Sequence, residues 1–169
     1  ALSTATVSAL STKTVQNLTT SQIANLTSSQ VQNLSTASLR ALTTSQLQGM
    51  ETSDLALLKT SQVAQLLTTQ LVDLTTTQIT ALTTGQVGAL SSAQVAALST
   101  SQVAAMETTD LAALTATNVV GLTSSQIAAI TTTQISAMES RDLTYLNTRQ
   151  LAGLTTSQIA VMTTVQMGG

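Results

Sequence analysis

Six of the seven acidic residues in this 169-residue chain form three pairs with the same spacing and context. In each pair a glutamate is followed three residues later by an aspartate, within the pattern M-E-[TS]-x-D-L. Two carboxylates at i, i+3 could bind calcium or pair with a cation on a neighbouring segment. They are the candidate metal ligands of this chain. The pairs are Glu51 with Asp54, Glu107 with Asp110, and Glu139 with Asp142.

The same pairs also suit the first turn of a helix, where a negative charge interacts favourably with the helix dipole. Calcium takes six to eight oxygen ligands, so two carboxylates would need ligands from elsewhere. The pairs are also unevenly spaced along the chain, so they need not be neighbours in space. We therefore favour a helix-capping role over a salt bridge or a metal site, and we expect no cofactor.

The remaining composition removes most other chemistry. The chain has no Cys, His, Phe or Trp, and its net charge is −2. Disulfides, thiolate sites and a histidine general base are excluded, and stacking platforms and basic patches for nucleic acid are absent. No single residue suggests a nucleophile or an acid–base pair in a pocket, so we predict that the protein is not an enzyme. The five basic residues are scattered, and we expect them on the solvated surface, with bridges to the acidic pairs as the alternative.

An eight-residue unit runs through the chain without insertion or deletion from Ser3. There are twenty full octads and a seven-residue remainder, with the approximate consensus [ST]-[TS]-x-Q-[VIL]-x-[AGN]-L. With Ser3 as position 1, position 5 is apolar in every octad and position 8 in every full one. A fixed short period is typical of repeat architectures. We therefore predict one array over residues 1–169, as part of a longer one. The acidic pairs take positions 1 and 4 of their octads, and they are separated by seven octads and then by four.

The spacing of the apolar positions argues against two familiar structures. In a continuous helix the apolar pair would rotate by roughly 80° per octad, so no stripe would keep facing a partner. In a straight strand, positions 5 and 8 would lie on opposite faces. The octad also lacks a recurring turn pair of Gly, Asn or Asp. A β-solenoid remains the alternative fold because Val, Ile and Thr favour strands.

Position 1 with position 4 forms the capping box S/T-x-x-Q, in which the hydroxyl accepts from one backbone amide and the Gln reaches back to another. The apolar residues before the cap and at position 5 form a hydrophobic staple, as Leu18 and Ile23 do around Thr19 and Gln22. Each octad thus predicts the start of a new helix.

The predicted helix must end within the octad. Position 7 is usually Ala, Gly or Asn, and Gly and Asn tolerate the left-handed conformation that closes many helices. A helix of about five or six residues is unstable alone and must pack on its neighbours. We therefore predict an all-α solenoid, with positions 5 and 8 in a narrow core and the hydroxyls of positions 1 to 3 outward. No substitution recurs every second or third octad, so the sequence does not say whether two or three octads make a turn.

The phrase Leu-Thr-Thr-Ser-Gln-Ile-Ala, at residues 18–24 and 154–160, resembles octapeptide arrays in very large bacterial secreted or surface proteins of the adhesin type. The resemblance covers the whole chain. It implies an extracellular or cell-surface structural or adhesive segment, and it carries over no catalytic residues.

Two non-catalytic functions follow from these observations. The first is a rigid spacer or self-assembling fibre element, since solenoid ends normally carry capping repeats and the first and last octads here look like interior ones. Low net charge also favours association. The second is a module that binds glycan, ice or another surface through its Ser/Thr rows. No apolar run is long enough to span a membrane as a helix.

Overall fold

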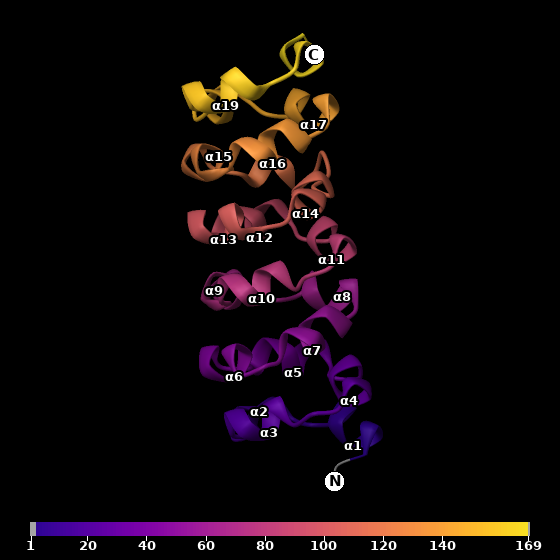
Figure 1. The fold of residues 1–169 in the computed structure, drawn as a ribbon. Coiled ribbons are helices and arrows are strands. Elements are labelled where there is room, and N and C mark those ends of the chain that lie inside the picture. Colours follow the sequence, from indigo (N-terminus) through magenta and orange to yellow (C-terminus); the bar gives the residue numbers. More distant parts are fainter. Residues whose placement is uncertain (1–2, 169) are drawn as a thin grey trace.

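The computed structural model describes residues 3–168, which form a single column of short helices stacked in layers (Figure 1). Each octad contributes one helix: the first fourteen carry α1 to α14, the fifteenth carries the 3₁₀ helix η1, and the rest carry α15 to α20. The described residues contain no strand, so the all-α prediction is confirmed and the β-solenoid alternative is wrong. The helices are α1 Thr4–Ser8, α2 Thr12–Gln16, α3 Thr20–Ala24, α4 Ser28–Gln32, α5 Thr36–Ala41, α6 Thr44–Gln48, α7 Thr52–Leu57, α8 Thr60–Val63, α9 Thr68–Asp73, α10 Thr76–Thr80, α11 Thr84–Gly88, α12 Ser92–Ala97, α13 Thr100–Ala105, α14 Thr108–Ala112, η1 Val119–Gly121, α15 Ser124–Ala129, α16 Thr132–Ala137, α17 Ser140–Thr144, α18 Thr148–Leu151, α19 Thr156–Val161 and α20 Thr164–Met167.

The helices begin as the capping box predicts. At α11 the Thr83 hydroxyl accepts from the Gln86 backbone amide at 3.3 Å, and Gln86 Oε1 accepts from the Thr83 amide at 2.8 Å. Thr83 itself is extended, with φ −76° and ψ 157°. The reciprocal pair satisfies two backbone amides that a helix start leaves without partners.

The helices do not end as predicted. No residue from 3 to 168 has a positive φ, so the left-handed closure expected at position 7 is wrong. Instead the residue at position 8 becomes extended, as Leu98 does with φ −60° and ψ 142°. Its amide donates to the carbonyl three residues earlier, Val95 O, at 3.2 Å. A single tight hydrogen bond and one extended residue thus turn the chain directly into the next cap, so the left-handed residue is not needed.

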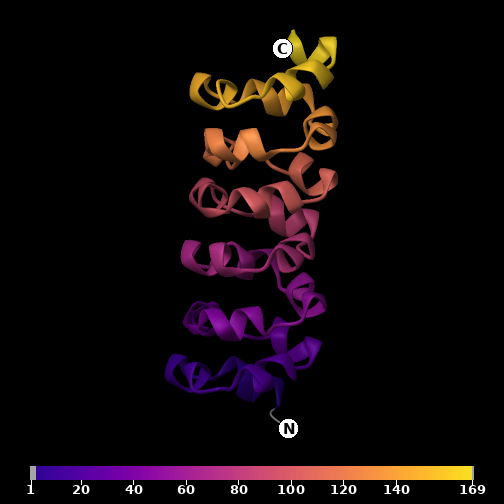
Figure 2. The same cartoon turned by 60° about the vertical axis from the view of Figure 1, so that its left-hand side comes forward.

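A turn of the superhelix takes between three and four octads. Each helix packs against the helix three octads away, as α10 does against α7 and α13. The hydrogen bonds of the position-4 side chain instead reach the octad four units back, as those of Gln86 reach Leu55, Ala56 and Leu58. An octad can make both contacts only if it rests between two octads of the layer below, namely those three and four units back. Neither two nor three octads therefore make a turn. Figure 2 shows the same regular layers from a second side.

The core lies along the axis of the column, as the octad pattern predicted. Position 5 is buried from Val7 to Leu143, and position 8 from Leu34 to Leu146. These side chains form one continuous apolar cluster. Because an isolated short helix is unstable, this shared core is what stabilises every helix.

Candidate functional site

The glutamine at position 4 makes a third set of contacts besides the two of the capping box. Gln86 is almost fully buried, with 1% of its surface exposed. Its Nε2 donates to Leu55 O at 2.9 Å and to Leu58 O at 2.7 Å, both in the layer below. These two carbonyls belong to positions 5 and 8 of the octad four units back. One position-4 side chain thus caps its own helix and also binds carbonyls of the octad four units back. We call this arrangement the amide clasp.

The amide clasp recurs in nearly every layer. A buried amide–carbonyl hydrogen bond contributes a net 0.5–1.5 kcal/mol or so, and leaving such a carbonyl without a donor costs about 1–3 kcal/mol. Repetition therefore makes the clasp a main polar contact between layers. The glutamines that bind the position-8 carbonyl of the octad four units back are Gln46, Gln62, Gln70, Gln78, Gln86, Gln94, Gln102, Gln126, Gln134, Gln150, Gln158 and Gln166.

Two substitutions at position 4 keep a donor in place. Ser38 donates its hydroxyl to Leu10 O at 3.3 Å. Asn118 donates its amide to Leu90 O at 3.2 Å, and its Oδ1 accepts from the Thr115 amide at 2.6 Å. A side chain one methylene shorter than glutamine therefore still forms the complete clasp.

The aspartates of the three acidic pairs occupy position 4 and are buried, whereas the glutamates at position 1 are exposed. None of the three glutamate side chains accepts from a backbone amide at its helix start, so these units are not hydroxyl-type caps. Burial raises the pKa of Asp54, Asp110 and Asp142, and the glutamate of the same unit raises it further. For Asp142, Arg141 and a hydrogen bond from the Glu139 backbone act on the pKa in the opposite direction.

The uneven spacing of the acidic pairs becomes regular in the folded chain. Seven octads correspond to about two turns and four octads to about one, because a turn takes between three and four. The helices α7, α14 and α17 accordingly lie above one another on one side of the column (Figure 1). We call this line of three units the acidic column.

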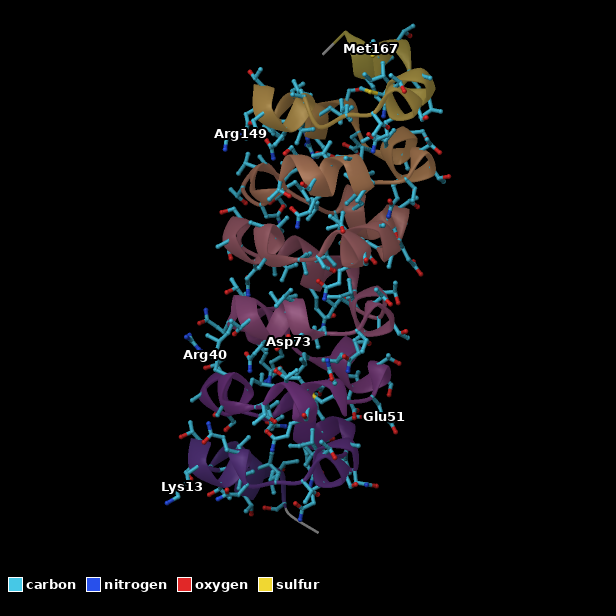
Figure 3. The ribbon with its side chains drawn as sticks, turned by 90° about the vertical axis from the view of Figure 1, so that its left-hand side faces the viewer. Lys13, Arg40, Glu51, Asp73, Arg149 and Met167 are labelled. Atoms are coloured by element: carbon cyan, nitrogen blue, oxygen red, sulfur yellow. The ribbon has the colours of Figure 1, made fainter. Side chains whose placement is uncertain are left out.

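The acidic column gathers little else that is charged. Within residues 3–168 no group of three or more acidic, His or Cys side chains could hold a metal ion. Glu139 and Arg141 form an exposed ion pair at 3.8 Å within one unit. Figure 3 shows Lys13, Arg40 and Arg149 at the opposite edge of the column from Glu51. These three basic residues lie far from Glu51, so their position favours the expected solvated surface over salt bridges to Glu51.

Residues 48–84, 80–106, 103–138 and 135–169 each match a family described as the ALTTAQ repeat. The chain belongs to the ALTTAQ repeat family. The comparison with curated proteins gives no match, and neither does the comparison with solved structures. The matched stretches include Asn118 and the three aspartates at position 4.

The letters of the ALTTAQ repeat correspond to the residues that build the clasp. In Ala81–Gln86 the sequence A-L-T-T-G-Q supplies the staple leucine, the capping threonine and the clasp glutamine. Sequence reasoning identified the first two roles and missed the third. A signal was present, because a capping box accepts Glu as well as Gln and no octad has Glu at position 4. This preference for Gln over Glu indicates that the amide donor has a role of its own, and the three octads with Asp at position 4 are exceptions to it.

The last layer of the described ALTTAQ column is open on its upper side. It has a hollow of about 380 Å³ lined mainly by apolar side chains, among them Leu146, Leu154, Ile159 and Met162. The position-5 residue Ile159, whose counterparts are buried in the interior layers, has 43% of its surface exposed.

None of the helices described is both long and apolar enough to cross a bilayer.

Proposed function

We propose that this ALTTAQ array is a non-catalytic structural segment, a rigid spacer or self-assembling element of an extracellular or cell-surface protein. The amide clasp carries the proposal. Because the same side chain fixes nearly every layer to the one below it, the column is held along its length by contacts inside its core. Stiffness between two distant points is what such a construction provides.

Self-association is the finer part of the proposal. The carbonyls of Leu154 and Met162 have no described donor, and the apolar hollow beside them has the lining of an interior layer. In the first described layer, Leu10 and Leu18 are only partly buried. Core apolar side chains are therefore only partly covered at both described ends of the column, and further octads, in the same chain or another copy, fit over them. A head-to-tail contact of this kind gives open filaments.

Electron microscopy and sedimentation of the purified protein over a concentration series test this proposal. We expect rods of constant width whose length grows with concentration. The matched variant is Ile159→Lys with Met162→Lys, which places charge in the open hollow and leaves the interior layers unchanged. It should remain monomeric with an unchanged far-ultraviolet circular dichroism spectrum. Wild-type particles that stay monomeric at every concentration would overturn self-association and leave the spacer role.

The hydroxyl rows support a surface-binding role less well. The side chains at positions 1 to 3 are largely exposed, as expected. However, a turn contains a non-integral number of octads, so the hydroxyls of successive layers are staggered around the column. A flat, aligned array of the kind that would match ice or another regular surface is not produced. We therefore favour the structural role.

The extracellular location rests on the resemblance to bacterial surface arrays. It is tested by adding a protease to intact source cells and following the array with an antibody. Loss of the array without lysis supports the proposed location, and complete protection contradicts it.

A further inference from the structure

Three carbonyl groups in the column lie where the amide clasp would bind them, yet have no amide above. They belong to Leu26, Leu82 and Leu114, the position-8 leucines four units before the aspartates of the acidic column. Among the described residues no hydrogen-bond donor reaches these three carbonyls. In the layer above Leu114, Asp142 Oδ2 is buried and has no hydrogen-bond partner. An ionised carboxylate is an acceptor only and cannot bind a carbonyl.

Asn118 shows what the same position does with a donor. Asparagine and aspartic acid have the same length, and Asn118 binds both its own cap amide and Leu90 O. A protonated carboxyl group has one acceptor oxygen and one O–H donor. It therefore offers the same two functions as the Asn118 amide.

We propose that Asp54, Asp110 and Asp142 are proton-binding sites that complete the amide clasp only in their protonated form. The proton, carried on one carboxyl oxygen, donates to the leucine carbonyl of the layer below. The other oxygen is free to accept from the glutamate amide of the same unit, as the Glu139 backbone shows at Asp142. Because all three sites lie in the acidic column, protonation tightens one side of the molecule.

The charges around these sites favour the proton. For Asp54, the helices packed on α7, namely α4 and α10, contain no charged residue, so Glu51 and the following Lys59 are the nearest in sequence.

The surroundings of the other two sites are similar. The neighbours of α14, which are α11 and α16, contain no charged residue, and Glu107 lies on its own unit. Asp142 has Glu139 and Arg141 on its own unit, and α20, which packs on α17, is uncharged. The unit four octads below Asp142 contains Glu107 and Asp110.

The direction of the pH effect follows from the raised pKa of the three aspartates. A carboxyl whose pKa is higher in the folded than in the unfolded chain binds more protons when folded. Its contribution to stability is fully present below the ordinary aspartate pKa of 3.8 and is lost as pH rises through the folded value. The protein should therefore be more stable in mild acid than at neutral pH.

A bound cation is the competing explanation, and the geometry favours it less. Calcium takes six to eight oxygens. Each site places one buried carboxyl group in register with the position-5 and position-8 carbonyls of the layer below, and the glutamate of the unit is exposed. The ligand set of one site is thus too small for calcium, whereas a single proton satisfies both the carboxyl and the carbonyl.

The test compares the melting temperature of the full chain between pH 3 and pH 8 with that of the triple variant D54N/D110N/D142N. We expect the wild-type Tm to rise as pH falls through the folded pKa values. In the triple variant the Tm should be higher than wild type at pH 8 and should lose most of this pH dependence. A second triple variant with Gln at the three positions restores the consensus clasp and should behave in the same way.

The matched control is E51Q/E107Q/E139Q, which also removes three negative charges from the acidic column, but at exposed positions. It should keep the rise in Tm with falling pH. If the Tm of the wild type and the Tm of D54N/D110N/D142N depend equally on pH, the proposal is overturned. A Tm at pH 8 that rises with calcium or sodium in the wild type alone would also overturn it, because the sites would then hold a cation.

Carboxyl ¹³C chemical shifts provide a direct readout. The three aspartate carboxyls should titrate at higher pH in the folded chain than in the same chain unfolded in urea. Identical midpoints in the two states would contradict proton binding. The result is independent of assembly, so failure here leaves the proposed structural role standing.

Discussion

A single side-chain type, the position-4 glutamine, links local and long-range structure in this protein. Its oxygen fixes the start of its own helix, and its nitrogen binds the layer below, as in Gln86. The amide is suited to this because it carries an acceptor and two donors on one planar group. Where aspartate replaces it, the acceptor is retained and the donor depends on a proton.

Replacing Gln86 by Met keeps the length of the side chain and removes the amide. Leu58 O and the Thr83 amide then lose their described partners. We expect the free energy of unfolding to fall by about 2–4 kcal/mol, since each buried orphaned group costs about 1–3 kcal/mol. Urea denaturation followed by circular dichroism measures the change.

Gln65→Met is the control, because Gln65 is exposed and its side chain makes no described hydrogen bond. Its effect should stay within about 0.5 kcal/mol, as for most surface substitutions. If the two variants lose the same stability, the clasp contributes nothing beyond an ordinary side chain.

At the scale of the helix, close packing between layers restricts position 7. Position 7 of one octad rests on position 2 of the octad three units before it at Gly121. There an added Cβ would lie 2.7 Å from the Ser92 carbonyl carbon and 2.8 Å from its Cα. This octad carries the shorter clasp residue Asn118 and the 3₁₀ helix η1 in place of an α-helix. Gly153 makes the same approach to Ser124 although its octad carries the full-length Gln150, so the shorter side chain is not the cause of the close packing.

Gly121→Ala should therefore be destabilising, by about 1–3 kcal/mol, because backbone atoms must move to admit the methyl group. Gly85→Ala is the matched variant. It lies in α11, and its new Cβ would have its nearest neighbour, Thr60 Cγ2, at 3.7 Å. Alanine there should stabilise by about 0.5–1 kcal/mol through helix propensity. Thermal melts of the two variants should shift in opposite directions, and shifts of the same sign would contradict the packing argument.

At the scale of the whole molecule, the octads are interchangeable. Every octad offers the same carbonyls to the layer above it, and nearly every octad offers the same side-chain amide to the layer below it. Deleting the full octad Thr75–Leu82 should leave the column intact, one unit shorter, with only a modest loss of stability. Each downstream glutamine still finds position-5 and position-8 carbonyls in the octad four units back.

Deleting only residues 79–82 is the corresponding control. It moves every later glutamine out of register with the octads before the deletion. We expect helical circular dichroism to be retained in the first variant and to fall in the second, together with its melting temperature. Equal losses in the two would show that length matters and register does not.

The octad pattern by itself determined the helix starts, the core positions and the solenoid class, because these depend on contacts within one octad and its immediate neighbour. Capping boxes, staples and apolar spacing are local, so the sequence contains them directly. The left-handed helix end that the pattern predicted at position 7 is wrong, because the extended residue at position 8 makes a left-handed residue unnecessary.

Only the tertiary structure decided how many octads make a turn and therefore which units meet. That number follows from how side chains of adjacent layers interlock, which no single octad encodes. Because of that number, acidic units that are seven and four octads apart in sequence lie in one acidic column. For the same reason, the glutamine amide meets carbonyls of the octad four units back. The sequence contains the residues of both features, but their partners are set by the pitch of the column.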